Sequence, residues 1–107
     1  MTVLGAGVEP LLSALALAHH GVPVTVAPTG TADPTELLTL STNGARVLHA
    51  LRLRDLVGRA GFAPEHEYFR DWRSGFILGH RPLGALASAR HGAPHRLCPA
   101  DELADLL

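Results

Sequence analysis

The feature that most constrains this chain is a glycine turn between an apolar strand and an apolar helix near its start. Residues Thr2 to Leu4 predict a short buried strand, which Gly5-Ala6-Gly7 breaks, and the Leu- and Ala-rich segment Pro10 to His20 predicts a buried helix. Gly21 is a natural helix stop. The continuous, β-branched segment Val22 to Val26 predicts a strand buried on both faces. Together these segments predict a right-handed βαβ unit.

Two further helices are predicted after a loop over residues 27–35. The first is capped by Ser41 or Thr42 and runs to about Leu51. The second covers about Arg54 to Arg59 and stops at Gly61. The apolar face of the first helix is expected to hold Val47, Leu48 and Leu51.

A β-hairpin is predicted beyond these helices, because two extended segments flank a turn. The strands are His66 to Arg70 and Gly75 to His80, and the turn is Asp71 to Gly75. We interpret the aromatic cluster of the hairpin as packing rather than as a stacking platform for a ligand. The cluster comprises Tyr68, Phe69, Trp72 and Phe76.

The last third of the chain predicts three short elements. Ala85 to Ala89 is compatible with a helical turn, Pro94 to Cys98 with an extended segment, and Asp101 to Leu107 with the first turns of a helix. The sequence therefore predicts an α/β fold with a partial Rossmann-like unit, followed by helices and a hairpin. A dinucleotide such as FAD or NAD(P) is the ligand that this fold class suggests.

Composition excludes several classes of function. With 107 residues, 47% apolar content and a net charge of −1, the chain is neither disordered nor a basic nucleic-acid binder. It has no apolar run long enough for a membrane-spanning helix. Residues 11–18 imitate a signal peptide, but no basic residue precedes them and Glu9 does, so we expect a cytoplasmic protein. The lone cysteine, Cys98, is interpreted as a buried thiol.

No metal-binding or catalytic residue is predicted. His91 and His95 have the spacing of neighbours on a helix, but Gly92 and Pro94 oppose a helix there. No Asp, Glu or Cys pattern completes a zinc site.

The glycine turn carries part of a dinucleotide-binding pattern. Gly5 and Gly7 take the first two glycine positions, where a tight turn brings the backbone close to a pyrophosphate. Pro10 takes the third position, and the second predicted strand is followed by Ala27, Pro28 and Thr29, with no acidic residue before Asp33. Glu9 places a carboxylate beside the expected phosphate site. A plain turn in an α/β protein remains the alternative.

The order of segments resembles the N-terminus of single-component flavin-dependent monooxygenases, of the para-hydroxybenzoate and salicylate hydroxylase type. The resemblance covers nearly the whole chain and includes the glycine turn, the hairpin and the closing segment Leu103 to Leu107. It is also carried by His20-Gly21-Val22-Pro23-Val24-Thr25-Val26 and by Leu38-Thr39-Leu40-Ser41-Thr42-Asn43-Gly44-Ala45-Arg46-Val47-Leu48.

The resemblance implies FAD as cofactor, NAD(P)H as its reductant, and hydroxylation of an aromatic or similar substrate with O₂. It implies that the FAD pyrophosphate meets Gly5, Gly7 and the intervening or following backbone, with Arg46 as a further contact. The backbone positions that complete this set are Ala6, Val8 and Glu9.

Three departures from the family fall on its FAD contacts. Pro10 replaces the third glycine, Pro28 replaces the ribose-binding glutamate, and Ala100 replaces the arginine that opens the last helix. We therefore expect weak or lost FAD binding. The family's later Gly-Asp motif and its substrate-binding sheet have no counterpart in these residues, and a third parallel strand is expected after Leu107. Residues 1–107 thus predict a single incomplete FAD-binding domain without a substrate domain.

Two alternatives stay open at this stage. One is a non-enzymatic α/β remnant or interaction module, which would pair with itself or with a complementing chain through an open sheet edge. The other is an NAD(P)-binding module that shares the glycine turn. Neither alternative requires a membrane or a nucleic acid.

Overall fold

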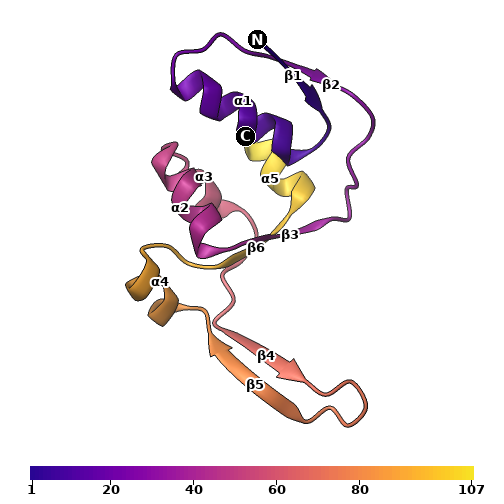
Figure 1. The fold of residues 1–107 in the computed structure, drawn as a ribbon, viewed down its shortest axis with the longest axis vertical. Helices are drawn as coiled ribbons and strands as arrows, with labels where there is room; N and C mark the ends of the chain where they lie inside the picture. The colour runs from indigo at the N-terminus through magenta and orange to yellow at the C-terminus, as the bar shows by residue number, and fades with distance from the viewer.

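Three separate two-stranded sheets organise the chain in the computed structural model, which describes residues 1–107 (Figure 1). One sheet is parallel and the other two are antiparallel. The parallel sheet pairs β1 (Thr2–Gly5) with β2 (Thr25–Pro28), and the antiparallel sheets pair β3 (Leu37–Leu40) with β6 (Arg96–Pro99) and β4 (His66–Arg70) with β5 (Ile77–Pro82).

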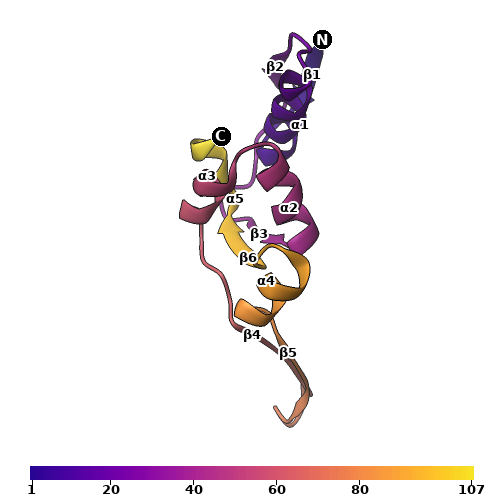
Figure 2. The ribbon, with the colours of Figure 1, turned by 90° about the vertical axis from the view of Figure 1, so that its left-hand side faces the viewer.

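The chain also forms five helices. The parallel sheet lies at one end of the molecule, the β4–β5 hairpin projects at the other end, and the β3–β6 pair lies between them (Figures 1 and 2). The helices are α1 (Val8–His19), α2 (Thr42–Ala50), α3 (Arg54–Arg59), α4 (Ala85–His91) and α5 (Ala100–Leu106).

The predicted βαβ unit is confirmed, but its second strand begins three residues later than expected. The backbone N–H of Val22 donates to Leu17 at the end of α1, and Pro23 has no N–H to donate. The ladder therefore begins where Thr25 donates to the carbonyl of Met1. The expectation that the second strand is buried on both faces is wrong. β2 is exposed at both ends and only half-buried between them, and the residues of β1 alternate between exposed and half-buried.

Helix α1 begins two residues earlier than predicted, directly after the glycine turn. The prediction of a buried helix holds for one face only. That face packs against the parallel sheet and α5, whereas Ser13 and the last turn are exposed. Its buried residues are Val8, Pro10 and Ala14.

Helices α2 and α3 lie where the sequence predicts them. The hydroxyl of Ser41 caps α2 by accepting from the backbone N–H of Gly44 at 3.4 Å. Val47, Leu48 and Leu51 lie on one face of the helix as expected, and Leu48 is buried there while Val47 is exposed. All three residues line an open groove between α1 and α2.

Strand β3 is not predicted by the sequence, and it provides the centre of the structure. Its four residues pair with β6, where only an extended segment was expected. β6 carries Cys98, which is fully buried, as predicted. Loss of solvation raises the pKa of this thiol, so it resists ionisation.

The segment after α3 is held against β6 by close backbone contacts. Phe62 and Leu97 exchange two backbone hydrogen bonds of 3.0 and 2.9 Å. The guanidinium of Arg96 donates to the carbonyl of Ala60 at 2.7 Å. Gly61 has a φ of +57°, and a Cβ atom on it would lie 1.9 Å from the carbonyl oxygen of Leu97. Only glycine fits at this position.

The predicted hairpin forms, with β4 at its expected bounds and β5 two residues later than expected. Its turn is closed by Asp71, whose carboxylate accepts from the backbone N–H and hydroxyl of Ser74. These hydrogen bonds lower the pKa of Asp71. The interpretation of the aromatic cluster as packing is wrong for this structure, because Trp72 and Phe76 are 84% and 75% exposed. The hairpin tip contacts no other element that could cover them (Figure 1).

The core is small for the length of the chain. Only 13 of 107 residues are buried, and the main cluster joins α1, β6 and α5 around Val8, Cys98 and Leu103. The radius of gyration is 16.2 Å, whereas a compact domain of this length measures about 13 Å. No helix is long and apolar enough to cross a bilayer. The molecule is therefore an elongated body with much apolar surface open to solvent.

Candidate functional site

The glycine turn between β1 and α1 has the backbone geometry of an anion cradle. Gly7 is the N-cap of α1, with φ 85° and ψ −153°, and no side chain caps the helix. The N–H groups of Val8 and Glu9 lie in the first turn, where a helix has no internal acceptor for them. A phosphate placed here would meet these donors and the positive end of the helix dipole.

Pro10 fills the space that close packing of helix and strand normally leaves to a glycine. Its ring is buried, and its Cγ atom lies 3.2 Å from the position that a Cβ on Gly5 would take. Because Gly5 lacks a Cβ, strand and helix still approach closely. The cost of Pro10 is one fewer backbone donor at the helix N-terminus.

A cavity of about 290 Å³ opens beside Gly7, and its charged lining is entirely acidic. Asp33 contributes one carboxylate from the loop after β2, while Asp101 and Asp105 contribute two more from α5. The Glu9 carboxylate also folds toward Gly7, with Oε2 3.5 Å from the position of a Cβ there. No Arg or His lines this cavity, so its field opposes an anionic ligand.

The electrostatics of Asp33 reinforce this field. Its carboxylate accepts from the backbone N–H and the hydroxyl of Thr35, at 2.8 and 2.6 Å. These hydrogen bonds lower the pKa of Asp33. The carboxylate is therefore ionised at neutral pH.

Arg46 lies in another part of the structure from the predicted pyrophosphate turn. It is exposed on α2 and lines a separate cavity with Asn43, Val47 and Ala50. The other predicted contacts, from Gly5 to Glu9, are contiguous around the start of α1.

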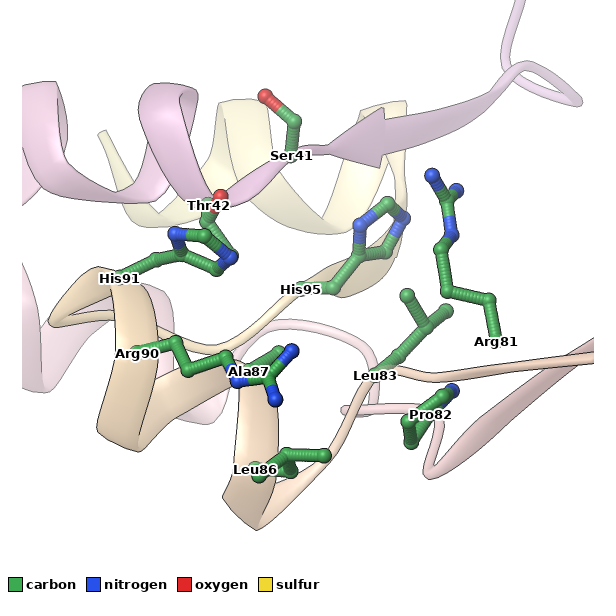
Figure 3. A pocket seen from close by; sticks show the side chains of 10 residues that line it. All are labelled: Ser41, Thr42, Arg81, Pro82, Leu83, Leu86, Ala87, Arg90, His91 and His95. Atoms are coloured by element: carbon green, nitrogen blue, oxygen red, sulfur yellow. The ribbon is translucent and has the colours of Figure 1, made fainter.

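A second polar cavity lies between α4, the start of α2 and the segment before β6 (Figure 3). Sequence reasoning considered two of its residues, His91 and His95, only as metal ligands. Arg90, His91 and His95 lie close together in the sequence, and this cluster of basic side chains could have pointed to the cavity. Arg81, which also lines the cavity, comes from β5 and is distant from them in the sequence.

Comparison with known proteins shows what this fold is similar to. Over 105 residues the chain is 33% identical to the 3-amino-4-hydroxybenzoate 2-monooxygenase PtnB3 of Streptomyces platensis, covering 96% of this chain and 26% of that protein. The 3-amino-4-hydroxybenzoate 2-monooxygenase of Streptomyces cremeus is 37% identical over 100 residues, 91% of this chain and 25% of that protein. The homologues of this chain are flavin-dependent monooxygenases. No protein-family model matches the chain.

Solved structures of flavoproteins share the fold. HpxO of Klebsiella pneumoniae, solved with FAD and uric acid, gives a TM-score of 0.79 at 25% identity, covering 97% of this chain and 26% of its own. The flavin-dependent monooxygenase PieE, solved with FAD and substrate, gives 0.67 at 21% identity, over 99% of this chain and 21% of its own. The chain thus spans about a quarter of the length of its flavin monooxygenase relatives.

The glycine turn offers backbone donors that suit FAD, but the side chains around it lack the partners that FAD needs. Pro28 lies directly opposite Gly5 in the parallel sheet, at the place where a ribose acceptor is expected. Ala100 opens α5 and lines the acidic cavity, where the family resemblance implies an arginine. The backbone turn therefore fits a pyrophosphate, whereas the surrounding charges do not.

Proposed function

We propose that residues 1–107 form a single incomplete FAD-binding domain of a flavin monooxygenase-like oxidoreductase, with weak or lost affinity for FAD. The observation that carries this proposal is the uncapped glycine turn of α1 inside a flavoprotein fold, next to a cavity with only acidic charges. The backbone at Gly5, Ala6, Gly7, Val8 and Glu9 is the proposed pyrophosphate contact. Arg46 would need a different arrangement of α2 to join it.

Two missing contacts and the acidic lining of the cavity both explain why the affinity for FAD should be low. Hydrogen bonds to charged groups contribute about 1.5–3 kcal/mol each, and the two lost partners at Pro28 and Ala100 are of this kind. The carboxylates of Asp101 and Asp105 add repulsion that solvent partly screens. Two missing contacts of this size lower affinity by at least about two decades.

The same proposal names the reductant and the substrate class of the reaction in which the complete protein would take part. NAD(P)H would be the reductant of the flavin and an aromatic or similar compound the substrate, as the family resemblance implies. No residue of the chain is proposed as catalytic. The protein is proposed to act in the cytoplasm and to lack catalysis by itself.

A titration of the purified chain with FAD, followed by flavin fluorescence, tests this proposal. We expect no saturation at FAD concentrations up to roughly 100 μM, a level that corresponds to about −5 to −6 kcal/mol of binding energy. The same titration with NADH should give no tighter binding. Saturation by FAD in the low micromolar range would show that the side-chain losses do not matter, and a stronger response to NADH would favour the NAD(P)-binding alternative.

Exposed apolar strands favour a second candidate function, an interaction module. Leu4 on β1 is 65% exposed and Leu78 on β5 is 73% exposed, and both sheets end after two strands. Open edges of this kind pair readily with another strand. A second copy or a chain that supplies the rest of the fold would cover them.

Light scattering on the purified chain distinguishes this candidate. If edge pairing is its function, we expect a dimer or larger species at micromolar concentration, dissociating on dilution. A charged substitution at an exposed edge position, Leu4→Lys, should shift the population toward monomer, while Leu86→Lys on the exposed face of α4 should not. A monomer that unfolds in one cooperative transition would speak against edge pairing.

A further inference from the structure

The cationic cavity shown in Figure 3 has a lining that the proposed flavin site does not use. Its volume is about 280 Å³, near the lower limit for a small-molecule site. Leu83 and Ala87 are buried and form an apolar floor. The guanidinium and imidazole side chains of the lining come from three different segments of the chain, and they are Arg81, Arg90, His91 and His95.

These cationic and imidazole groups have almost no partner within the protein. The only ion pair in the structure joins Arg81 to Glu67 on the neighbouring strand. Arg90, His91 and His95 form no ion pair, and no acidic side chain lines the cavity. The unpaired Arg90 guanidinium, on a concave surface without a carboxylate, produces a positive potential that attracts anions. The imidazoles of His91 and His95 add N–H donors to the same surface.

The start of α2 adds backbone and hydroxyl donors to the same cavity. Ser41 is the N-cap of this nine-residue helix and Thr42 is its first residue, and both line the cavity. Ser41 already serves the N–H of Gly44, which leaves the N–H groups of Thr42 and Asn43 in the first turn without an intrahelical acceptor. The positive end of the α2 dipole therefore acts in the same direction as the side chains.

We propose that this cavity is a binding site for a small oxyanion, a carboxylate or phosphate group, held by Arg90 and His95 and by the start of α2. Arg90 offers a planar fork of donors that matches either group. His95 is half-buried and offers a ring N–H in any protonation state. The apolar floor of Leu83 and Ala87 favours an anion attached to a small organic body over a free ion.

Titration of the 107-residue chain with benzoate and, separately, with inorganic phosphate tests the site by amide chemical shifts. We expect saturable shifts at Thr42, Ala87 and His95, with benzoate saturating at the lower concentration. A phosphate that saturates first still supports an oxyanion site and assigns it to a free ion. Sodium chloride at matched ionic strength should not reproduce these shifts.

Charge-removing variants decide whether the cavity itself is responsible. Arg90→Ala should weaken binding by about tenfold or more, and Arg90→Gln should match it, which separates the loss of charge from any loss of packing. Arg73→Ala removes the same charge from the hairpin tip and should leave binding unchanged. Equal weakening by Arg73→Ala, shifts spread over the whole surface, or no saturation with either probe would overturn the proposal. None of these outcomes depends on FAD binding.

Discussion

Replacing Gly61 with alanine is expected to destabilise the chain by at least about 3 kcal/mol, enough to unfold a domain with so small a core. The new Cβ would lie 1.9 Å from the carbonyl oxygen of Leu97 and 2.8 Å from the Cα of Cys98. These are backbone atoms of β6, and they cannot move without breaking the paired hydrogen bonds between Phe62 and Leu97. The positive φ of Gly61 adds strain for any residue with a side chain.

Urea denaturation followed by circular dichroism measures this effect, and Gly58→Ala provides a matched control. Gly58 lies in α3, and a Cβ there would meet nothing within 4 Å. Alanine at this helical position should raise the free energy of unfolding by about 0.5–1 kcal/mol. If both variants unfold at the urea concentration of the parent, the close approach of Gly61 to β6 does not exist in solution.

Local sequence signals predict the local elements of this fold well. Ser41 caps a helix because its side chain serves an N–H three residues away, and the hairpin closes through contacts within the Asp71–Gly75 segment. Such patterns are complete within a few residues. Gly61 shows the limit of this approach, because the sequence indicates only a helix stop there. Its close contact is with Leu97, which is far away in the chain.

The β3–β6 pair shows why non-local structure escaped prediction. β3 has only four residues, with the sequence Leu-Leu-Thr-Leu, and its partner lies beyond the hairpin and α4. Nothing local favours pairing between them. The interpretation of the aromatic cluster as packing is wrong for a related reason. A cluster that includes Trp72 and Phe76 predicts an apolar surface, but it does not predict whether another part of the protein covers that surface.

The candidate site likewise has a local part that the sequence predicts and a non-local part that it does not. The glycine turn is contiguous in sequence, and the structure places Gly7 at the start of α1 as expected. The acidic cavity is assembled from Asp33, Asp101 and Asp105, which belong to two distant segments, so no spacing rule connects them. The sequence therefore predicts the cradle but not the charges that face it.

Restoring the two lost side chains is expected to raise the affinity for FAD by at least about 100-fold, because each charged contact contributes about 1.5–3 kcal/mol. The double variant is Pro28→Glu with Ala100→Arg. Pro28 is exposed and lies opposite Gly5, so a glutamate there would stand at the carboxyl end of β2. Ala100 lines the acidic cavity, so an arginine there would neutralise part of the field of Asp101 and Asp105. Because Ala100 is also buried in the core cluster, circular dichroism must first show that the variant keeps the fold of the parent. Fluorescence titration with FAD, at fixed ionic strength, measures the change.

Matched controls separate specific contacts from altered net charge. Pro28→Gln changes shape without adding a carboxylate, and Ala89→Arg adds the same cation on the exposed surface of α4. Neither should improve FAD binding by more than a few-fold. Asp101→Asn with Asp105→Asn should give an intermediate gain, since it removes repulsion but adds no partner. If the double variant binds no better than Ala89→Arg, the acidic cavity and the turn of α1 do not form one site, and the flavoprotein fold of this chain serves a purpose other than holding a dinucleotide.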